Sequence, residues 1–226
     1  MRQDSSLAFQ RVGEFRRRGI DPPRLRLSLT LPELDAVLGG GLPCGAITEI
    51  FGGVSSGRTT LAQVLISAVT LGGEFAAWID LPNAFDPHCA RAAGVDLERM
   101  LWVSPTDHLA ALRAVEHVLD AGGFRVVVLD LDCASGVRSM LPAAAWLRLG
   151  RAAACRNAAI VVIATAHAVG TFAALSLEAC ANRRVFAGEG GPCPVFQGAT
   201  SSLRIERHKF GPPVTTPVEL RASIKG

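Results

Sequence analysis

The most constraining feature of the sequence is a run rich in glycine and hydroxyl side chains, Gly52-Gly53-Val54-Ser55-Ser56-Gly57-Arg58-Thr59-Thr60. It fits the phosphate-binding loop pattern G-x-x-x-x-G-K-[ST] at every defined position except the lysine, which is Arg58. The segment before it, residues 46–51, is typical of a strand, and the segment after it, residues 59–71, is typical of a helix. That order places the loop amides and the helix N-terminus around one anion. The sequence therefore predicts a strand–loop–helix unit with a phosphate hollow.

The residues of this loop have distinct expected roles. Gly52 and Gly57 permit the tight backbone angles that turn successive N–H groups into one hollow. The side chain at position 58 reaches the phosphate oxygens in such loops, and the hydroxyl of Thr59 would ligate Mg²⁺. The loop residues predicted to contact a nucleotide are Gly52, Ser55, Ser56, Gly57, Arg58, Thr59 and Thr60.

Apolar strands and helices alternate along the rest of the chain. We expect strands at 75–80, 101–104, 125–130 and 159–164, and helices at 86–93, 107–121 and 141–156. The longer strands are continuously apolar, which indicates a parallel sheet buried on both faces. Residues 201–208 and 218–221 also favour strands, and the Gly-Pro-Pro between them predicts an antiparallel end to the sheet. The expected fold class is α/β, a mostly parallel twisted sheet covered by helices.

Composition bounds the class of protein. The 226 residues, 49% of them hydrophobic, suffice for one α/β domain, and the net charge of +3 permits nucleic-acid contact without demanding it. No apolar run has the length of a membrane span, and the Arg-rich start lacks the apolar stretch of a signal peptide, so we expect a cytoplasmic protein without a membrane partner. The six cysteines show no C-x-x-C spacing, which favours free thiols. Residues 1–28 are expected to form a basic arm or helix, and residues 29–226 the core.

A second part of the site is expected where strand 125–130 ends. Asp130 closes an apolar run there and fits the acid that helps to hold Mg²⁺ in phosphate-loop proteins; Asp132 is a weaker candidate. An acid at this place is also common as a cap of the following turn. The phosphate loop upstream favours the metal-binding interpretation.

Several segments resemble the core of bacterial RecA. They are Leu38-Gly39-Gly40-Gly41-Leu42-Pro43, Glu49-Ile50-Phe51-Gly52, Ser55-Ser56-Gly57-Arg58-Thr59-Thr60-Leu61-Ala62, Trp78-Ile79-Asp80-Leu81-Pro82-Asn83-Ala84-Phe85-Asp86-Pro87 and Gly94-Val95-Asp96, with looser similarity at Val126 to Asp130 and at Leu203-Arg204-Ile205. The resemblance runs from residue 30 to residue 210 and is most specific up to Asp96. It implies a RecA-like core with ATP and Mg²⁺ as ligands and with Asp86 as a contact to adenine.

The departures from the RecA pattern fall on the chemistry of ATP hydrolysis. Arg58 keeps the charge of the lysine, but its planar head is larger and places its donors differently. RecA-like ATPases carry a glutamate that activates water two residues after the acid ending strand 75–80. That acid is Asp80 here, so the matching position is Pro82, which has no base. Because general-base catalysis typically contributes about 10²–10⁴-fold, the resemblance implies impaired hydrolysis.

Two further positions depart from the family. The aromatic residue that stacks on adenine falls at Cys89, so that platform is lost. The polar sensor expected after strand 159–164 falls near Ala166 or His167. His167 is a candidate substitute, although a single histidine is more often structural.

DNA contacts are expected in two stretches, because two loops within the RecA core contact single-stranded DNA. The first, residues 131–140, contains one cation, Arg138, and the second, residues 169–200, contains Arg183 and Arg184. Basic and aromatic side chains together follow a nucleic-acid backbone and stack on bases, and an ordinary surface loop explains them equally well. Arg138, Arg183 and Arg184 are the candidate DNA contacts.

A short RecA-like chain with a degraded ATPase is similar to the ImuA group of accessory proteins, which act in SOS-type, damage-inducible translesion synthesis. The ending Arg207-His208-Lys209-Phe210-Gly211-Pro212-Pro213 is also similar to that group. The resemblance implies an adaptor whose partners are an ImuB-like Y-family polymerase homologue and an error-prone replicative-type polymerase. RecA itself and single-stranded DNA are further candidate partners.

Two alternatives remain open. One is an active, DNA-stimulated ATPase, a recombination mediator, in which Arg58 functions and a neighbouring subunit supplies the base. The other is a cell-division inhibitor of the SulA type, which is also a reduced RecA-like fold. The intact glycines of the loop favour the mediator, because a pure inhibitor has no use for a phosphate hollow.

Overall fold

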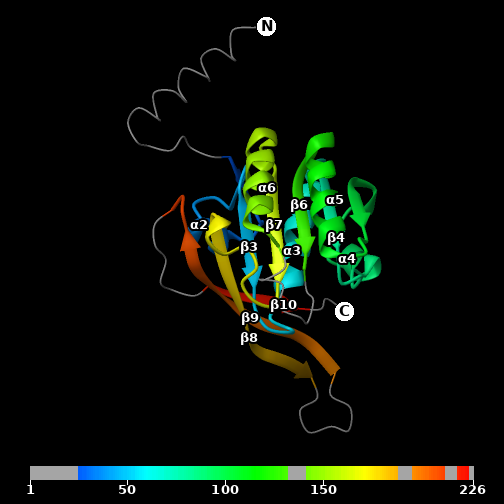
Figure 1. The fold of residues 1–226 in the computed structure, drawn as a ribbon. Helices are drawn as coiled ribbons and strands as arrows, with labels where there is room; N and C mark the ends of the chain where they lie inside the picture. The colour runs from blue at the N-terminus through cyan, green and yellow to red at the C-terminus, as the bar shows by residue number, and fades with distance from the viewer. Residues whose placement is uncertain (1–24, 132–140, 188–194, 212–217, 224–226) are drawn as a thin grey trace, which may run out of the picture.

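A computed structural model describes residues 25–131, 141–187, 195–211 and 218–223 of the chain (Figure 1). The main sheet has eight strands in the order β10-β9-β8-β3-β7-β6-β4-β5. They are β3 (Ile47–Phe51), β4 (Phe75–Asp80), β5 (Met100–Val103), β6 (Phe124–Asp130), β7 (Ala159–Ala164), β8 (Leu175–Ala187), β9 (Val195–His208) and β10 (Val218–Ser223). Pairing is parallel from β5 to β8 and antiparallel from β8 to β10. The predicted α/β class, with its antiparallel end, is confirmed.

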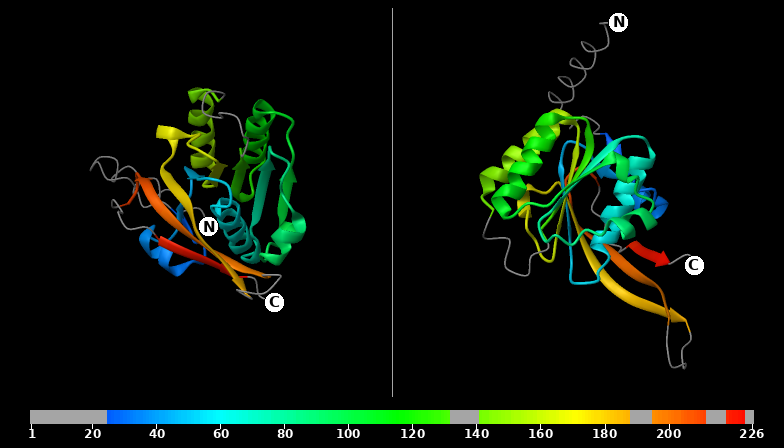
Figure 2. Two further views of the ribbon diagram at one scale, coloured as in Figure 1. Left: turned by 90° about the horizontal axis from the view of Figure 1, so that it is seen from below. Right: turned by 90° about the vertical axis from the view of Figure 1, so that its right-hand side faces the viewer.

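Helices cover both faces of this sheet (Figure 2). They are α2 (Pro32–Val37), α3 (Arg58–Leu71), α4 (Pro87–Ala92), α5 (His108–Ala121) and α6 (Ala143–Arg156), with single 3₁₀ turns η1 (Leu97–Arg99) and η3 (Gly170–Phe172). Helix α3 shares a core layer with Ile50 and Trp78, whereas α5 and α6 share the opposite layer with Ile79. Trp78 and Ile79 are neighbours on β4, and successive side chains of a strand point to opposite faces of the sheet, so one strand contributes side chains to both core layers. This explains why the strand sequences are continuously apolar.

Helix boundaries follow local chemistry that is visible in the sequence. Helix α4 begins after Asp86, whose carboxylate accepts the backbone N–H of His88 at 2.8 Å, and Pro87 takes the first helical position. Helix α5 begins after Asp107, which accepts the N–H of Ala110 at 2.8 Å, and this contact holds the pKa of Asp107 below its usual range. These caps fix both helices within a residue or two of their predicted starts.

One expectation about the second half of the chain is wrong. The stretch 169–200, expected to match a DNA-binding loop, consists largely of β8 and the beginning of β9, which pair as a long antiparallel hairpin. Its first part, Leu175 to Ala181, alternates apolar and small or polar residues, which is the pattern of a half-buried strand. Arg183 and Arg184 therefore belong to a strand, while Arg138 lies outside the described residues.

The first elements of the described chain are held in place by a strand pairing and by a hydrogen bond to the residues after β9. Strand β1 (Arg26–Leu27) pairs with β2 (Leu42–Pro43) in a separate two-stranded sheet. The guanidinium of Arg26 donates to the carbonyl of Phe210 at 2.9 Å and so ties this sheet to the end of β9. The basic arm expected at residues 1–28 lies almost wholly outside the described residues. Among the helices that the structure describes, none combines the length and apolar content needed to cross a bilayer.

Candidate nucleotide site

The carboxyl ends of the central parallel strands meet at one edge of the sheet. Phe51 is paired with Ala164 at the ends of β3 and β7, and Asp80 with Asp130 at the ends of β4 and β6. Ligands of α/β proteins bind at this edge, because the loops that follow the strands converge there. The predicted phosphate loop leaves β3 at this edge.

The loop has the backbone geometry of an anion site. Gly57 has a φ of +92° and immediately precedes helix α3, whose first turn contains no acid and receives no side-chain cap. Ser55 also has a positive φ, of +61°. In the described part of the chain the start of α3 has no side-chain cap hydrogen bond, and backbone amides at such a helix start attract phosphate.

Ser56 gives the strongest sign that the hollow receives a ligand. The residue is 2% exposed, and within the part of the chain that the structure describes its hydroxyl has no hydrogen-bond partner. A buried hydroxyl without a partner costs about 1–3 kcal/mol, which a phosphate oxygen in the hollow would offset. Ser55, Thr59 and Thr60 are exposed, so the Thr59 hydroxyl is accessible to a solvated cation. These residues fit ATP with Mg²⁺.

Arg58 does not extend into solvent as the lysine of an open loop does. Its side chain is only 4% exposed, at the first position of α3. Asp130, the predicted magnesium ligand, is 5% exposed. The loop therefore keeps a positive charge at its base, but that charge is carried by a buried and bulky head.

The hairpin of β8 and β9 packs closely against the phosphate loop at Gly52 and Gly57, and we call this side of the loop its wall. At Gly52, where φ is +155°, an added Cβ would come within 2.1 Å of the carbonyl oxygen of Ala179 on β8. At Gly57, an added Cβ would come within 2.9 Å of the Ser201 hydroxyl on β9. Glycine is required at both positions by this close packing as well as by any phosphate, so the glycines alone are weak evidence for nucleotide binding.

Asp80 is a structural residue. It is fully buried, and its carboxylate accepts the backbone N–H groups of Ala84 and Phe85, each at 3.0 Å, and the indole N–H of Trp102 at 3.1 Å. The carboxylate therefore shapes the turn after β4 that contains Pro82. Proline has no side-chain group that accepts a proton.

Asp86, the predicted adenine contact, is exposed and caps α4. A hydrogen bond with the Cys89 side chain, followed by the backbone N–H of His88, lowers the pKa of Asp86, and the same carboxylate raises the pKa of the Cys89 thiol. Cys89 is exposed at the position where the RecA pattern has an aromatic ring. Asp86 thus remains accessible, but no aromatic platform accompanies it at that position.

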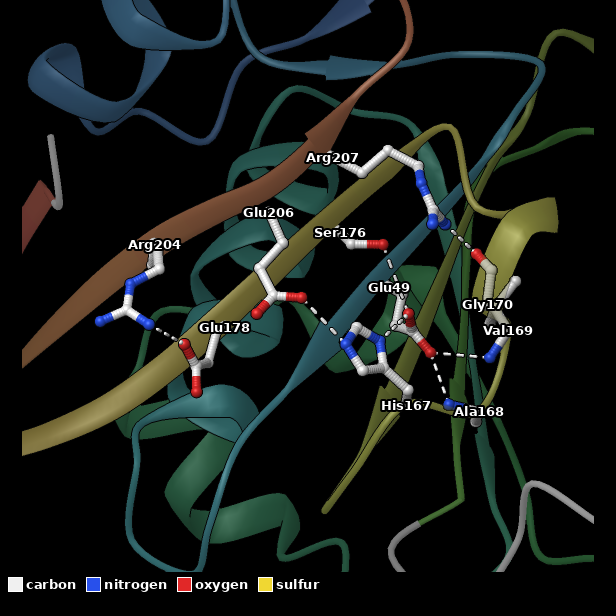
Figure 3. A network of polar contacts seen from close by, with 10 residues as sticks. All are labelled: Glu49, His167, Ala168, Val169, Gly170, Ser176, Glu178, Arg204, Glu206 and Arg207. Atoms are coloured by element: carbon white, nitrogen blue, oxygen red, sulfur yellow. Dashed lines mark hydrogen bonds and ion pairs between the residues drawn. The ribbon is translucent and has the colours of Figure 1, made fainter. Parts of the chain in front are cut away.

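His167, the candidate sensor, is held between two carboxylates (Figure 3). Its Nδ1 lies 3.0 Å from Oε2 of Glu49 on β3, and its Nε2 lies 2.9 Å from Oε2 of Glu206 on β9. Both ring nitrogens are therefore engaged within the protein. Sequence reasoning missed Glu49, although a glutamate in the middle of the apolar strand Ile47–Phe51 was a visible signal of a buried polar contact.

Comparison with known proteins gives a consistent family. Residues 27–144 match the family described as RecA N-terminal domain. Over 97 residues the chain is 42% identical to Protein RecA of Rippkaea orientalis and 43% identical to Protein RecA of Trichodesmium erythraeum, covering 43% of this chain and 28% and 27% of those proteins. It is 37% identical over 123 residues to Protein RecA of a Nostoc species, covering 54% of this chain and 33% of the relative. The matched part thus spans no more than a third of these relatives' length.

The wall behind the loop leads to a prediction for two adjacent glycines. Gly52→Ala should destabilise the fold by about 2 kcal/mol or more, because the new methyl group meets the Ala179 carbonyl and the backbone has a conformation that alanine rarely adopts. Gly53→Ala is the matched control, since an added Cβ there meets nothing within 4 Å and its φ is not in the positive range. Urea denaturation measures both. Equal stabilities of the two variants would contradict the packing described here.

Proposed function

Because the chain belongs to the family of the RecA N-terminal domain, we propose that it is a RecA-like accessory protein of DNA-damage repair that binds ATP and Mg²⁺ but hydrolyses ATP poorly. The observation that carries the proposal is the contrast between the phosphate loop and the turn after β4. The loop retains a buried Ser56 hydroxyl that has no hydrogen-bond partner among the described residues, beside a start of α3 where those residues provide no side-chain cap. The turn has Pro82 where the family has its catalytic base, and the carboxylate of Asp80 is occupied by three donors.

Different residues of the site would contact the phosphates, the cation and the adenine of the nucleotide. The loop amides, the N-terminus of α3 and the Ser56 hydroxyl would hold the phosphates, and Arg58 would neutralise their charge from beneath. Thr59 and Asp130 would hold Mg²⁺, and Asp86 would contact adenine. The cation supplies charge neutralisation on the phosphates when it is bound. Without a base at position 82, about 10²–10⁴-fold of the rate of hydrolysis is lost.

The cellular role that we propose is that of an adaptor in damage-inducible translesion synthesis in the cytoplasm. It rests on the similarity of the short core and of residues 207–213 to the ImuA group. Proposed partners are an ImuB-like polymerase homologue, an error-prone replicative-type polymerase, RecA and single-stranded DNA. Arg138, Arg183 and Arg184 remain the candidate DNA contacts.

Nucleotide binding is tested by calorimetric titration of the purified chain with ATP and Mg²⁺. Wild type should bind, and the nucleotide recovered afterwards should still be ATP. Ser56→Ala should weaken binding about two- to tenfold, as expected for one lost hydrogen bond, and should not destabilise the fold, because that hydroxyl has no partner within the described part of the protein. Val54→Ala, at a loop position 83% exposed, is the control that should bind as wild type does. Equal affinities of all three proteins would show that ATP does not occupy this hollow.

The adaptor role is tested in cells. Deleting the gene should lower damage-induced mutation to the uninduced frequency, because the error-prone polymerases would lose the protein that assembles them. Wild type and Val54→Ala should restore the induced frequency. Unchanged mutagenesis in the deletion strain would exclude the adaptor role, and filamentous growth on overexpression would favour a cell-division inhibitor instead.

A further inference from the structure

His167 joins the strand that leads into the phosphate loop to the hairpin that forms its wall. The imidazole bridges Glu49 on β3 and Glu206 on β9, at 3.0 and 2.9 Å (Figure 3). It is contributed by neither strand, since residue 167 follows β7. Three parts of the chain, up to 157 residues apart, therefore meet at one ring.

The two carboxylates differ in their surroundings. Glu49 is fully buried, and its Oε1 accepts the backbone N–H groups of Ala168 at 2.6 Å and Val169 at 2.7 Å, while its Oε2 also lies 3.3 Å from the Ser176 hydroxyl. The side chain of Glu206 is 36% exposed. If one contact of the ring is lost, Glu206 has water as a replacement partner and Glu49 does not.

Counting hydrogens defines the state of the ring. A neutral imidazole carries one N–H and one lone pair, whereas an imidazolium carries two N–H groups. Both nitrogens of His167 lie within hydrogen-bond distance of a carboxylate oxygen. With both carboxylates ionised, a ring with a single proton would turn a lone pair toward one of these oxygens, so the pair of contacts fits a ring that carries a proton on each nitrogen.

The charged groups around the bridge have other contacts. Arg204, two residues from Glu206, pairs with Glu178 of β8 at 3.0 Å. The Arg207 guanidinium donates to the carbonyl of Gly170, and the Lys209 ammonium donates to the carbonyl of Thr171 at 2.6 Å. Each of these three cations has an acceptor other than Glu206, and among the described residues the ring of His167 is the partner that the structure gives to Glu206.

The ring also touches the last residue before the loop. Its centroid lies 3.9 Å from that of the Phe51 ring. Glu49 and Phe51 are two residues apart on β3, so they share the face that His167 covers. Gly52 follows directly: its N–H donates to the carbonyl of Ala164 at 3.3 Å, and a Cβ added to it would meet the carbonyl of Ala179. The entrance of the phosphate loop is thus fixed by β7, by β8 and by this ring.

We propose that His167, protonated on both nitrogens, is a positioning residue that clamps β9 to the start of the phosphate loop, and that loss of one ring proton releases Glu206. The remaining Nδ1–H stays on buried Glu49. The clamp therefore needs both ring protons, because only a ring with two N–H groups donates to Glu49 and to Glu206 at once.

The bridge is tested without nucleotide by ring-nitrogen NMR of the full chain labelled with ¹⁵N-histidine, with His167→Gln assigning the signal. In parallel, urea denaturation of wild type, His167→Gln, Glu206→Gln and the double variant measures the coupling between the two side chains across pH. Where the ring carries two protons, the coupling should equal about a two- to fivefold change in the unfolding equilibrium constant, and it should vanish where the ring carries one. Glu178→Gln, on the neighbouring ion pair, should show no coupling to His167.

Two results would overturn the bridge. One is a ring that carries a single proton throughout the pH range in which the protein is folded. The other is a coupling between His167 and Glu206 that does not change when the ring titrates.

The positioning role rests on the proposed nucleotide binding, and ADP titrations at a series of pH values test it. The ratio of wild-type to His167→Gln affinity should fall across the pH step at which the ring loses its proton. A constant ratio, with ADP bound, would refute the positioning role. If ADP binds at no pH, the nucleotide proposal and the positioning role both fail, while the NMR and coupling measurements still decide whether the protonated bridge exists.

Discussion

The carboxylate of Glu49 is the contact on which the arrangement around the loop depends. A charged group placed at the centre of a sheet is costly unless it is fully hydrogen-bonded. Here the backbone amides of Ala168 and Val169 supply the donors, so the chain after β7 is fixed against β3. Strand β8 then begins beside β3, with Ser176 directly opposite Glu49, and β9 returns antiparallel to it. The hairpin wall behind the phosphate loop follows from this one buried contact.

This arrangement separates the scaffold of the site from its chemistry. The scaffold needs glycine at positions 52 and 57, because the hairpin approaches the backbone there, and needs Asp80 to shape the turn after β4. These requirements persist whether or not ATP is hydrolysed. The two positions at which the RecA pattern has a catalytic side chain differ here. Arg58 takes the place of the lysine and is buried, and Pro82 takes the place of the glutamate and offers no base. Under the proposed function, this RecA-family chain keeps the fold and the binding of nucleotide rather than its turnover.

Much of the fold was predictable from the sequence because its strands are continuously apolar and its helices carry their own caps. Strands 75–80 and 159–164 have the predicted bounds, and α4 begins within one residue of its predicted start, after the cap of Asp86. Strand 201–208 was predicted, but β8 and the first residues of β9 were not, because residues 169–200 were assigned to a loop by analogy although the alternation from Leu175 onward indicated a strand. The His167 bridge was out of reach for a different reason. It joins residues 49, 167 and 206, and no local pattern reveals which distant carboxylates a histidine will meet.

The central claim is the proposal that the phosphate loop keeps its binding geometry while the hydrolysis of ATP is impaired. Phosphate release at saturating ATP and Mg²⁺, with and without single-stranded DNA, tests it most directly when wild type is compared with Asp130→Asn. The account predicts that release by wild type stays at the background of the variant in both conditions. DNA-stimulated release that disappears in Asp130→Asn would contradict it and would identify an active mediator ATPase.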